Sequence, residues 1–158
     1  MTNQMTDQLS ILIFDDEIYK SLGNSFVIEL TYKLKPYHVR VDLGLSINNF
    51  ESYAKSNRYS VFILDIKSPV PHNWKSVVDG TKVNPSLAGV ELLHRIKMGK
   101  YGENNKHAYI FMRTTRFEPW LRKDCLDAGA NGYFAVGGQD LELIDAIKKS
   151  INKDGGLE

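Results

Sequence analysis

Three aspartates carry the clearest chemical signal in this sequence. Asp15 and Asp16 directly follow the apolar run 10–14, and Asp65 directly follows the apolar run 61–64. A buried carboxylate without a partner costs several kcal/mol, so we expect aspartates at the ends of such runs to lie at the mouth of a site or around a ligand. Carboxylate oxygens favour Mg²⁺, which takes one or two of them together with phosphate and water. An aspartate beside this ion is also able to attack phosphorus and form an aspartyl phosphate.

The elements that must position these aspartates alternate between strands and helices. Four strands are predicted to be buried and a fifth, at 37–43, to have one exposed face; the buried ones lie at 10–14, 61–64, 109–112 and 133–136. Helices are predicted between them, at about 18–35, 46–56, 90–99, 118–128 and 141–152. This alternation predicts an α/β fold of the flavodoxin-like type, a doubly wound parallel sheet of five strands with helices on both faces.

The expected strand order is 2-1-3-4-5, which places the half-exposed strand at an edge of the sheet. In this order the strands that end at Asp15-Asp16 and at Asp65 flank the point where the order changes direction. Ligands of open α/β sheets bind there, outside the carboxyl ends of the strands. Thr114 ends a third buried strand, so its hydroxyl is a candidate to donate a hydrogen bond to a phosphate oxygen.

Composition limits the class of protein. The chain has 158 residues, 42% hydrophobic and 25% charged, which suits one globular domain spanning 1–158. A net charge of +1 gives no bulk attraction to nucleic acid or membranes, and no apolar run is long enough to cross a bilayer. Cys125 is the only cysteine, and residues 1–8 do not resemble an export signal. We expect a cytoplasmic monomer or weak homodimer, with no direct binding to nucleic acid or membrane.

An irregular segment at about 68–86 interrupts the regular pattern. It is longer than the connections of about two to six residues that are usual in this fold class. Two interpretations remain open: a lid or partner surface anchored by Trp74 and Val77-Val78, or a surface loop with Trp74 packed against the fold. The C-terminal tail is expected to fray from about Lys153.

The order and spacing of these residues resemble the receiver domains of two-component response regulators, over nearly the whole chain. The matching positions are the acidic pair Asp15-Asp16, the phosphoacceptor Asp65 followed by Pro69, the helix start Gly89-Val90-Glu91-Leu92-Leu93, the hydroxyl residue Thr114, and the aromatic switch residue Tyr133 within Gly129-Ala130-Asn131-Gly132-Tyr133.

The resemblance implies a Mg²⁺ cofactor whose ligands are Asp15, Asp16, Asp65 and the backbone carbonyl of Lys67. It implies that Asp65 accepts a phosphoryl group from a histidine kinase or phosphotransfer protein, and that Thr114 and Tyr133 act as the switch. Tyr133 would rotate inward and change the face made by the fourth helix, fifth strand and fifth helix, which signals to an unknown downstream protein. At most, self-phosphorylation and autodephosphorylation are expected, with no independent metabolic activity.

One departure from the family concerns charge. The family's lysine at the end of the fifth strand is replaced by Val136. A phosphoryl group brings roughly −1.5 to −2 of charge, and removing a cation that neutralises buried charge costs about 2–5 kcal/mol. Candidate substitute cations are Lys67, Arg113, Arg116 and Lys82.

Two other functions are compatible with the sequence. The missing lysine and the irregular segment also suit a pseudo-receiver that docks a partner without phosphorylation. A flavodoxin-like enzyme or nucleotide binder is the third interpretation, although Asp15-Asp16-Glu17 stands where such proteins place a glycine-rich phosphate loop.

Overall fold

The computed structural model describes residues 8–155, and its centre is one five-stranded sheet. The strand order is β2-β1-β3-β4-β5 and every neighbouring pair is parallel, as the sequence predicted. The strands are β1 (Ser10–Phe14), β2 (Arg40–Gly44), β3 (Val61–Leu64), β4 (Tyr109–Thr114) and β5 (Gly132–Ala135). The first, third and fourth strands are almost wholly buried, whereas β2 lies half-buried at one edge. The prediction of a buried last strand was wrong: β5 is half-buried except at Tyr133, because it lies at the other edge and has a neighbouring strand on one side only.

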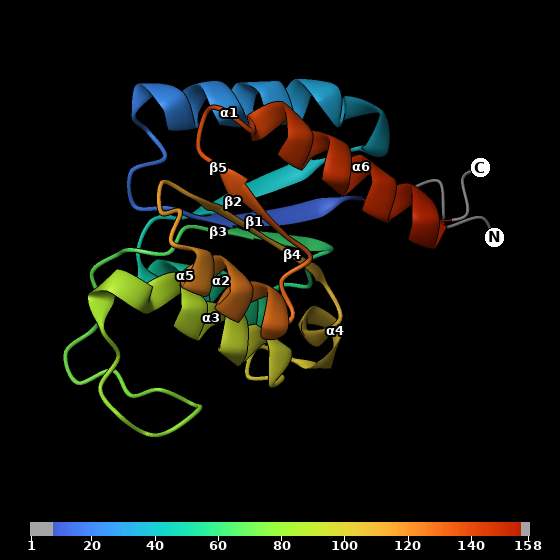
Figure 1. The fold of residues 1–158 in the computed structure, drawn as a ribbon. Coiled ribbons are helices and arrows are strands. Elements are labelled where there is room, and N and C mark those ends of the chain that lie inside the picture. Colours follow the sequence, from blue (N-terminus) through green and yellow to red (C-terminus); the bar gives the residue numbers. More distant parts are fainter. Residues whose placement is uncertain (1–7, 156–158) are drawn as a thin grey trace.

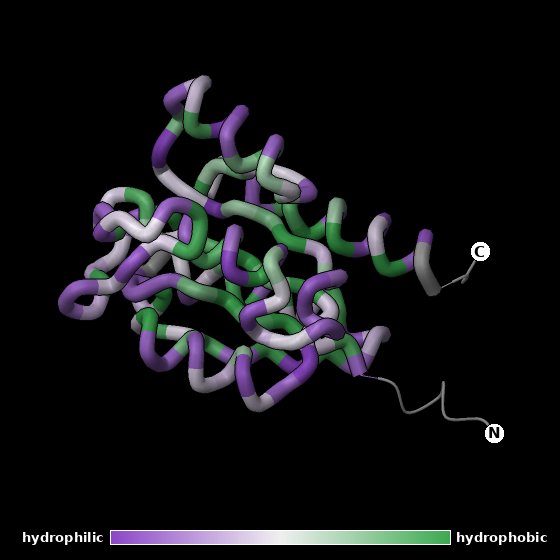
Figure 2. The backbone as a smooth tube through the Cα atoms, turned by 90° about the horizontal axis from the view of Figure 1, so that it is seen from below, coloured by the Kyte–Doolittle hydropathy of each residue, from purple (hydrophilic) through white to green (hydrophobic). Residues whose placement is uncertain are grey.

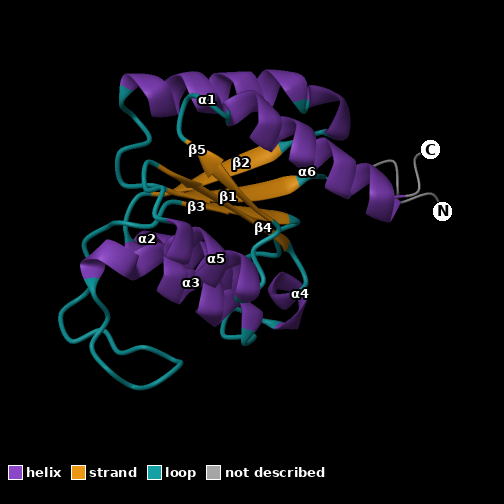
Figure 3. Cartoon of the chain, viewed as in Figure 1, coloured by secondary structure: helices purple, strands orange, loops and turns teal. Residues whose placement is uncertain are grey.

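Helices cover both faces of the sheet, which confirms the doubly wound arrangement. α1 and α6 lie on one face, and α2, α3 and α5 lie on the other, with the short α4 at the end of that layer (Figures 1 and 3). Their bounds are α1 (Ser21–Lys33), α2 (Ile47–Ser56), α3 (Ala88–Lys97), α4 (Glu103–Lys106), α5 (Pro119–Asp127) and α6 (Asp140–Gly155), with 3-10 turns at Lys35–Tyr37 and Pro85–Leu87.

Each face of the sheet has its own hydrophobic core, because successive strand residues point to opposite faces. Ile11, Ile13 and Ile63 pack beneath α1 and α6. Leu12, Phe14 and Leu64 pack against α2, α3 and α5. Hydrophobic segments are concentrated inside the molecule and hydrophilic ones on the outer turns of the helices (Figure 2). The same alternation determines toward which face of the sheet the first residue after a strand points.

Several local features match the expected boundaries. The Ser46 side chain accepts a hydrogen bond from the Asn49 N–H at 3.1 Å and so caps α2. Gly129, just after α5, has a φ of +112°, the left-handed region in which glycine is favoured.

Other boundaries differ from the prediction. β2 begins at Arg40 rather than at residue 37, because Pro36 favours a 3-10 turn that spans Lys35–Tyr37. α4 was not predicted, since only four residues form it. Leu141 is 58% exposed and is not part of the buried stripe of α6, which consists of Leu143, Ile144 and Ile147.

The irregular segment contains no helix or strand up to the 3-10 turn at Pro85–Leu87, but it is closed by an antiparallel bridge between Lys75 and Lys82. α6 continues to Gly155, so the tail that we expected to fray from Lys153 is helical there, and residues 156–158 lie outside the described part. Within residues 8–155, no helix is both long and apolar enough to cross a membrane.

Candidate functional site

The three aspartates singled out by the sequence meet at the carboxyl edge of the sheet. Asp15, Asp16 and Asp65 each offer a carboxylate oxygen within 4.8 Å of the others. The parallel register pairs Phe14 of β1 with Leu64 of β3, so the residues that follow them are neighbours. These carboxylates thus lie where the strand order changes direction, as the sequence predicted.

Local hydrogen bonds orient two of the carboxylates. The Glu17 N–H donates to Asp15 Oδ1 at 2.8 Å, and the Ile66 N–H donates to Asp65 Oδ1 at 2.7 Å. Within the described residues, no hydrogen bond to the Asp16 carboxylate is formed. Each oriented aspartate therefore keeps its second oxygen, and Asp16 keeps both, for other interactions.

A pocket of about 550 Å³ opens beside this cluster. Asp16 and Asp65 face it, whereas Asp15 is only 9% exposed and lies outside its lining. The lining residues are Asp16, Glu17, Asp65, Lys67, Ser68, Pro69, Pro85, Thr114, Thr115 and Arg116. The pocket brings the carboxylates together with three hydroxyl residues and two cationic side chains.

Burial and mutual repulsion make the cluster costly in its ionised form. Burial raises the pKa of Asp65 to about 7, and the nearby Asp15 and Asp16 carboxylates add to the rise. Burial also raises the pKa of Asp15, while the Glu17 N–H and the Arg113 guanidinium oppose that rise. A divalent cation would relieve both effects, because it neutralises the oxygens where water is scarce.

This donor set fits Mg²⁺. Three carboxylates with oxygens this close suit a small hard cation that prefers oxygen ligands and retains water. The pocket beside Asp16 and Asp65 has room for that water and for a phosphoryl group. Lys67, whose backbone carbonyl is the fourth expected ligand, lines the same pocket, but its role as a ligand stays a prediction.

Gly89 packs closely against the backbone of Asp65. The Gly89 N–H donates to the Ile66 carbonyl at 2.8 Å, and a Cβ at position 89 would collide with the Asp65 carbonyl oxygen. Only glycine permits the first turn of α3 to approach this backbone so closely. The glycine at this helix start, which matched the receiver pattern, is thus required for steric reasons.

Thr114 lies at the end of β4 on the pocket wall and is 1% exposed. Its Oγ accepts a hydrogen bond from the Arg116 N–H at 3.1 Å. Because that bond uses a lone pair, the hydroxyl proton remains available to donate to a phosphate oxygen.

Tyr133 is already in an inward position. It is 7% exposed, and its hydroxyl donates to the Arg116 carbonyl at 2.7 Å. Tyr133 thus occupies the position that an inward rotation would reach, and its role as a switch stays a prediction. The Arg116 carbonyl accepts a hydrogen bond from the Tyr133 hydroxyl, and the Arg116 N–H donates one to Thr114 Oγ. The two switch candidates are thus connected through Arg116.

The four candidate cations occupy different places. Lys67 and Arg116 line the acidic pocket, but Arg116 pairs with Glu118 at 2.6 Å and donates to the Ser86 carbonyl at 2.6 Å. Lys82 lines a different pocket. Arg113, 3% exposed at its side chain, lies behind the cluster with Nη1 at 3.7 Å from Asp15 Oδ2.

Arg113 also pairs with a residue that sequence reasoning missed. Its Nε and Nη2 donate to the two carboxylate oxygens of Asp140 at 2.8 and 3.1 Å. The only sequence signal for Asp140 was an acidic residue at the start of a predicted helix, which is commonly explained by the helix dipole.

Val136, where the family has lysine, is half-buried just after β5.

The irregular segment is held to α3 by buried contacts. Trp74, 9% exposed, lies under the Arg95 guanidinium at 4.2 Å from its ring centre. Arg95 pairs with Glu91 at 2.9 Å and with Glu51 at 3.1 Å. Trp74 thus packs against the fold, whereas Val78, expected as part of the anchor, is 58% exposed.

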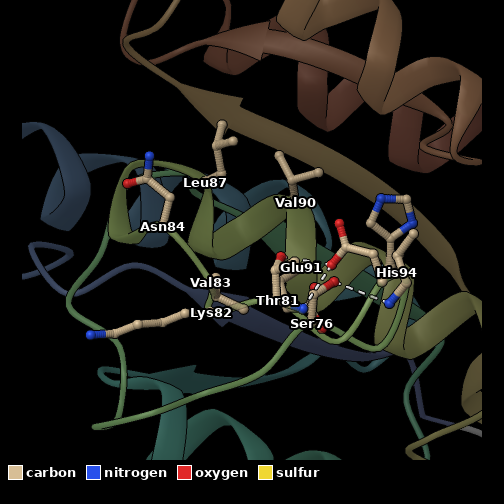
Figure 4. A pocket seen from close by; sticks show the side chains of 11 residues that line it. Ser76, Thr81, Lys82, Val83, Asn84, Leu87, Val90, Glu91 and His94 are labelled. Atoms are coloured by element: carbon tan, nitrogen blue, oxygen red, sulfur yellow. Dashed lines mark hydrogen bonds between the residues drawn. The ribbon is translucent and has the colours of Figure 1, made fainter.

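A second pocket, of about 300 Å³, lies between this segment and α3 (Figure 4). Ser76, Thr81 and Lys82 come from the segment, while Val90, Glu91 and His94 come from α3. The Glu91 carboxylate accepts from the Val77 N–H at 2.8 Å and so helps to hold the pocket's two sides together. None of these residues belongs to the acidic cluster.

Comparisons with known proteins gave fold matches but no sequence family. No protein-family model matches this chain, and no curated protein is similar to it in sequence. Among solved structures, the chain resembles chemotaxis protein CheY4 of Vibrio cholerae with 19% identity and a TM-score of 0.63, over 90% of this chain and 98% of that one.

Two further solved structures are similar. A CheY-like response regulator receiver domain of Methanospirillum hungatei JF-1 has 17% identity and a TM-score of 0.65, over 96% of this chain and 100% of that one. The receiver domain of a DNA binding response regulator of Colwellia psychrerythraea 34H has 16% identity and a TM-score of 0.66, over 91% and 98% respectively. With its strand order and helix layers, the chain has the CheY-like fold of response-regulator receiver domains.

Proposed function

We propose that this protein is a receiver-like signalling domain that accepts a phosphoryl group on Asp65 in a Mg²⁺-dependent reaction. The observation that carries this proposal is the convergence of Asp15, Asp16 and Asp65 at the switch point of the sheet. Asp65 faces a pocket large enough for a phosphoryl group, and Thr114 lines the same pocket.

Each residue has a role that follows from its position. Asp15, Asp16, Asp65 and the Lys67 carbonyl would hold Mg²⁺, which offsets negative charge on phosphoryl oxygens when it is bound. A carboxylate oxygen of Asp65 attacks phosphorus as the bond from phosphorus to the donor's histidine nitrogen breaks. The imidazole leaves with the bonding electrons, and the Thr114 hydroxyl donates a hydrogen bond to a phosphoryl oxygen.

The signal would leave the site through the loop between β4 and α5. A shift of Thr114 toward the phosphoryl group would pull on the Arg116 N–H, and the Arg116 carbonyl holds the Tyr133 hydroxyl. The face made by α5, β5 and α6 would change with it. Phe117, just before α5, and Trp120, in its first turn, are 61% and 51% exposed, which suits contact with a downstream protein.

The phosphoryl donor would be a histidine kinase or phosphotransfer protein, as the fold suggests. The test does not need that partner. Incubating the protein with acetyl phosphate and Mg²⁺ and measuring intact mass should show the addition of one phosphoryl group. The addition should disappear in Asp65→Asn and in EDTA, and persist in Asp79→Asn, which changes an exposed aspartate of the irregular segment.

A different result would reject the proposal. If no phosphoryl group is added, or if the addition survives Asp65→Asn, Asp65 is not the acceptor. Partner binding that is unaffected by Asp65→Asn but lost on changes around Trp74 would point instead to the docking module without phosphorylation.

A further inference from the structure

The positive charge nearest the acidic cluster comes from β4 rather than from β5. Phe14 pairs with Leu64, and Leu64 pairs with Met112, so one position further along Asp15, Asp65 and Arg113 form a row across β1, β3 and β4. Side chains of this row point toward α1 and α6, because each stands two residues after a core residue of that face.

The next strand explains why Val136 does not complete this row. Arg113 pairs with Phe134, so position 136 lies two residues further along β5, past its end. The side chain there is half-buried and apolar. A cation in the row itself is therefore available only from β4.

Arg113 joins three elements around the cluster. Its guanidinium carbon lies 4.2 Å from the centre of the Phe26 ring of α1. Nη1 lies 3.7 Å from Asp15 Oδ2, just after β1, and Nε and Nη2 donate to Asp140 in the first turn of α6. A guanidinium held by two hydrogen bonds on one edge has a fixed orientation, so its remaining nitrogen is directed at Asp15.

We propose that Arg113 is the positioning residue that supplies this site's fixed positive charge, and that Asp140 limits how much of that charge acts on the acidic cluster. This inference rests on the proposed function, because it concerns the same Mg²⁺ and phosphoryl site. The guanidinium orients Asp15 and opposes anionic repulsion around Asp65, while the Asp140 carboxylate neutralises part of it. The positive charge that the family places at the end of β5 is thus supplied here by Arg113 of β4, and its partner Asp140 in α6 reduces it.

The proposal predicts opposite effects on cation and anion binding. Arg113→Gln removes a positive charge, so the cluster becomes more negative, binds Mg²⁺ more tightly and binds a phosphoryl-like anion more weakly. Asp140→Asn removes the opposing negative charge and reverses both effects. The double variant removes both charges, so its affinities for Mg²⁺ and for the anion should both be close to those of the wild type.

The experiment uses calorimetric titration of the full chain with Mg²⁺, and then with beryllofluoride at saturating Mg²⁺. Each single variant should change each affinity by about fivefold or more, the low end of typical coupling between sites. Arg58→Gln is the matched control, because Arg58 is exposed just before β3, at the amino ends of the strands; it should change neither affinity. Circular dichroism verifies folding.

The results of these titrations distinguish a failure of the proposed function from a failure of the proposed role of Arg113. Wild-type protein that binds neither Mg²⁺ nor beryllofluoride overturns the proposed function and this inference with it. Wild-type binding with single variants that change both affinities in the same direction, or neither, overturns only the role of Arg113. If Arg113→Gln does not fold, Asp140→Asn decides: weaker Mg²⁺ binding with tighter beryllofluoride binding supports the proposal, and any other pattern refutes it.

Discussion

Replacing Asp65 with asparagine should stabilise the metal-free protein at pH 8. Burial and the neighbouring carboxylates raise the pKa of Asp65 from 3.8 to about 7, so ionising this group in the folded state is costly. At 1.36 kcal/mol for each pKa unit, the ionised carboxylate destabilises the fold by at most about 4 kcal/mol. Water and salt in the open pocket screen part of this repulsion, so we expect a gain of about 1–3 kcal/mol. In a chain of this size, that gain corresponds to a rise in Tm of about 3–9 °C.

The pH dependence has a definite sign. A raised carboxyl pKa means that the folded protein holds a proton that the unfolded chain has lost, so the contribution of Asp65 to the stability of the wild type falls as pH rises from 3.8 toward 7. The difference between Asp65→Asn and the wild type should therefore be largest above pH 7 and shrink toward pH 4. Mg²⁺ should stabilise the wild type more than the variant, since its binding is linked to folding.

Thermal melting in EDTA at pH 8 and pH 5, and in Mg²⁺ at pH 8, measures these differences. Asp79→Asn serves as the control because its exposed carboxylate has a pKa lowered by hydrogen bonds from Thr81. It should bring no gain at pH 8. A variant Asp65→Asn that melts at or below the wild-type temperature in EDTA at pH 8 would contradict the description of Asp65 as a destabilised, buried carboxylate.

Three further changes test the surroundings of the site. Trp74→Ala should lower the free energy of unfolding by about 3 kcal/mol, because it empties a buried position beneath Arg95. Urea unfolding measures this loss, and faster amide exchange in residues 74–83 locates it. Unchanged exchange there would contradict the anchoring role of Trp74. Gly89→Ala should displace the Asp65 carbonyl and greatly slow phosphorylation by acetyl phosphate while the protein stays folded; wild-type rates would show that this backbone contact is dispensable. Tyr133→Phe removes one partly buried hydrogen bond and should lower the free energy of unfolding by about 1 kcal/mol. Thermal melting detects this loss, and its absence would argue against that bond in solution.

The sequence predicted the fold because the pattern of each element agrees with the whole. Apolar runs such as 61–64 have no polar alternation, which is typical of strands covered on both faces, and the one alternating strand was correctly placed at an edge. The aspartates followed from the same logic, since parallel strands place their carboxyl ends at one edge. Leu141 was misplaced because one apolar residue at a helix start does not define the buried stripe.

The sequence did not predict which charges pair. Four cations were candidates, and only the register of β4 shows that Arg113 lies in line with Asp15 and Asp65. Its partner Asp140 is 27 positions away in the chain, and no periodic pattern links them. Long-range pairs of this kind depend on crossover geometry, which hydrophobic spacing does not specify.

A crystal structure of the protein grown with Mg²⁺ and beryllofluoride tests the central claim most directly. We expect a metal ion bound by oxygens of Asp15, Asp16 and Asp65 and by the Lys67 backbone carbonyl, and a beryllofluoride group on an oxygen of Asp65 within hydrogen-bond distance of the Thr114 hydroxyl. An ion bound elsewhere, or an Asp65 carboxylate left unmodified at saturating concentrations of both reagents, would contradict it.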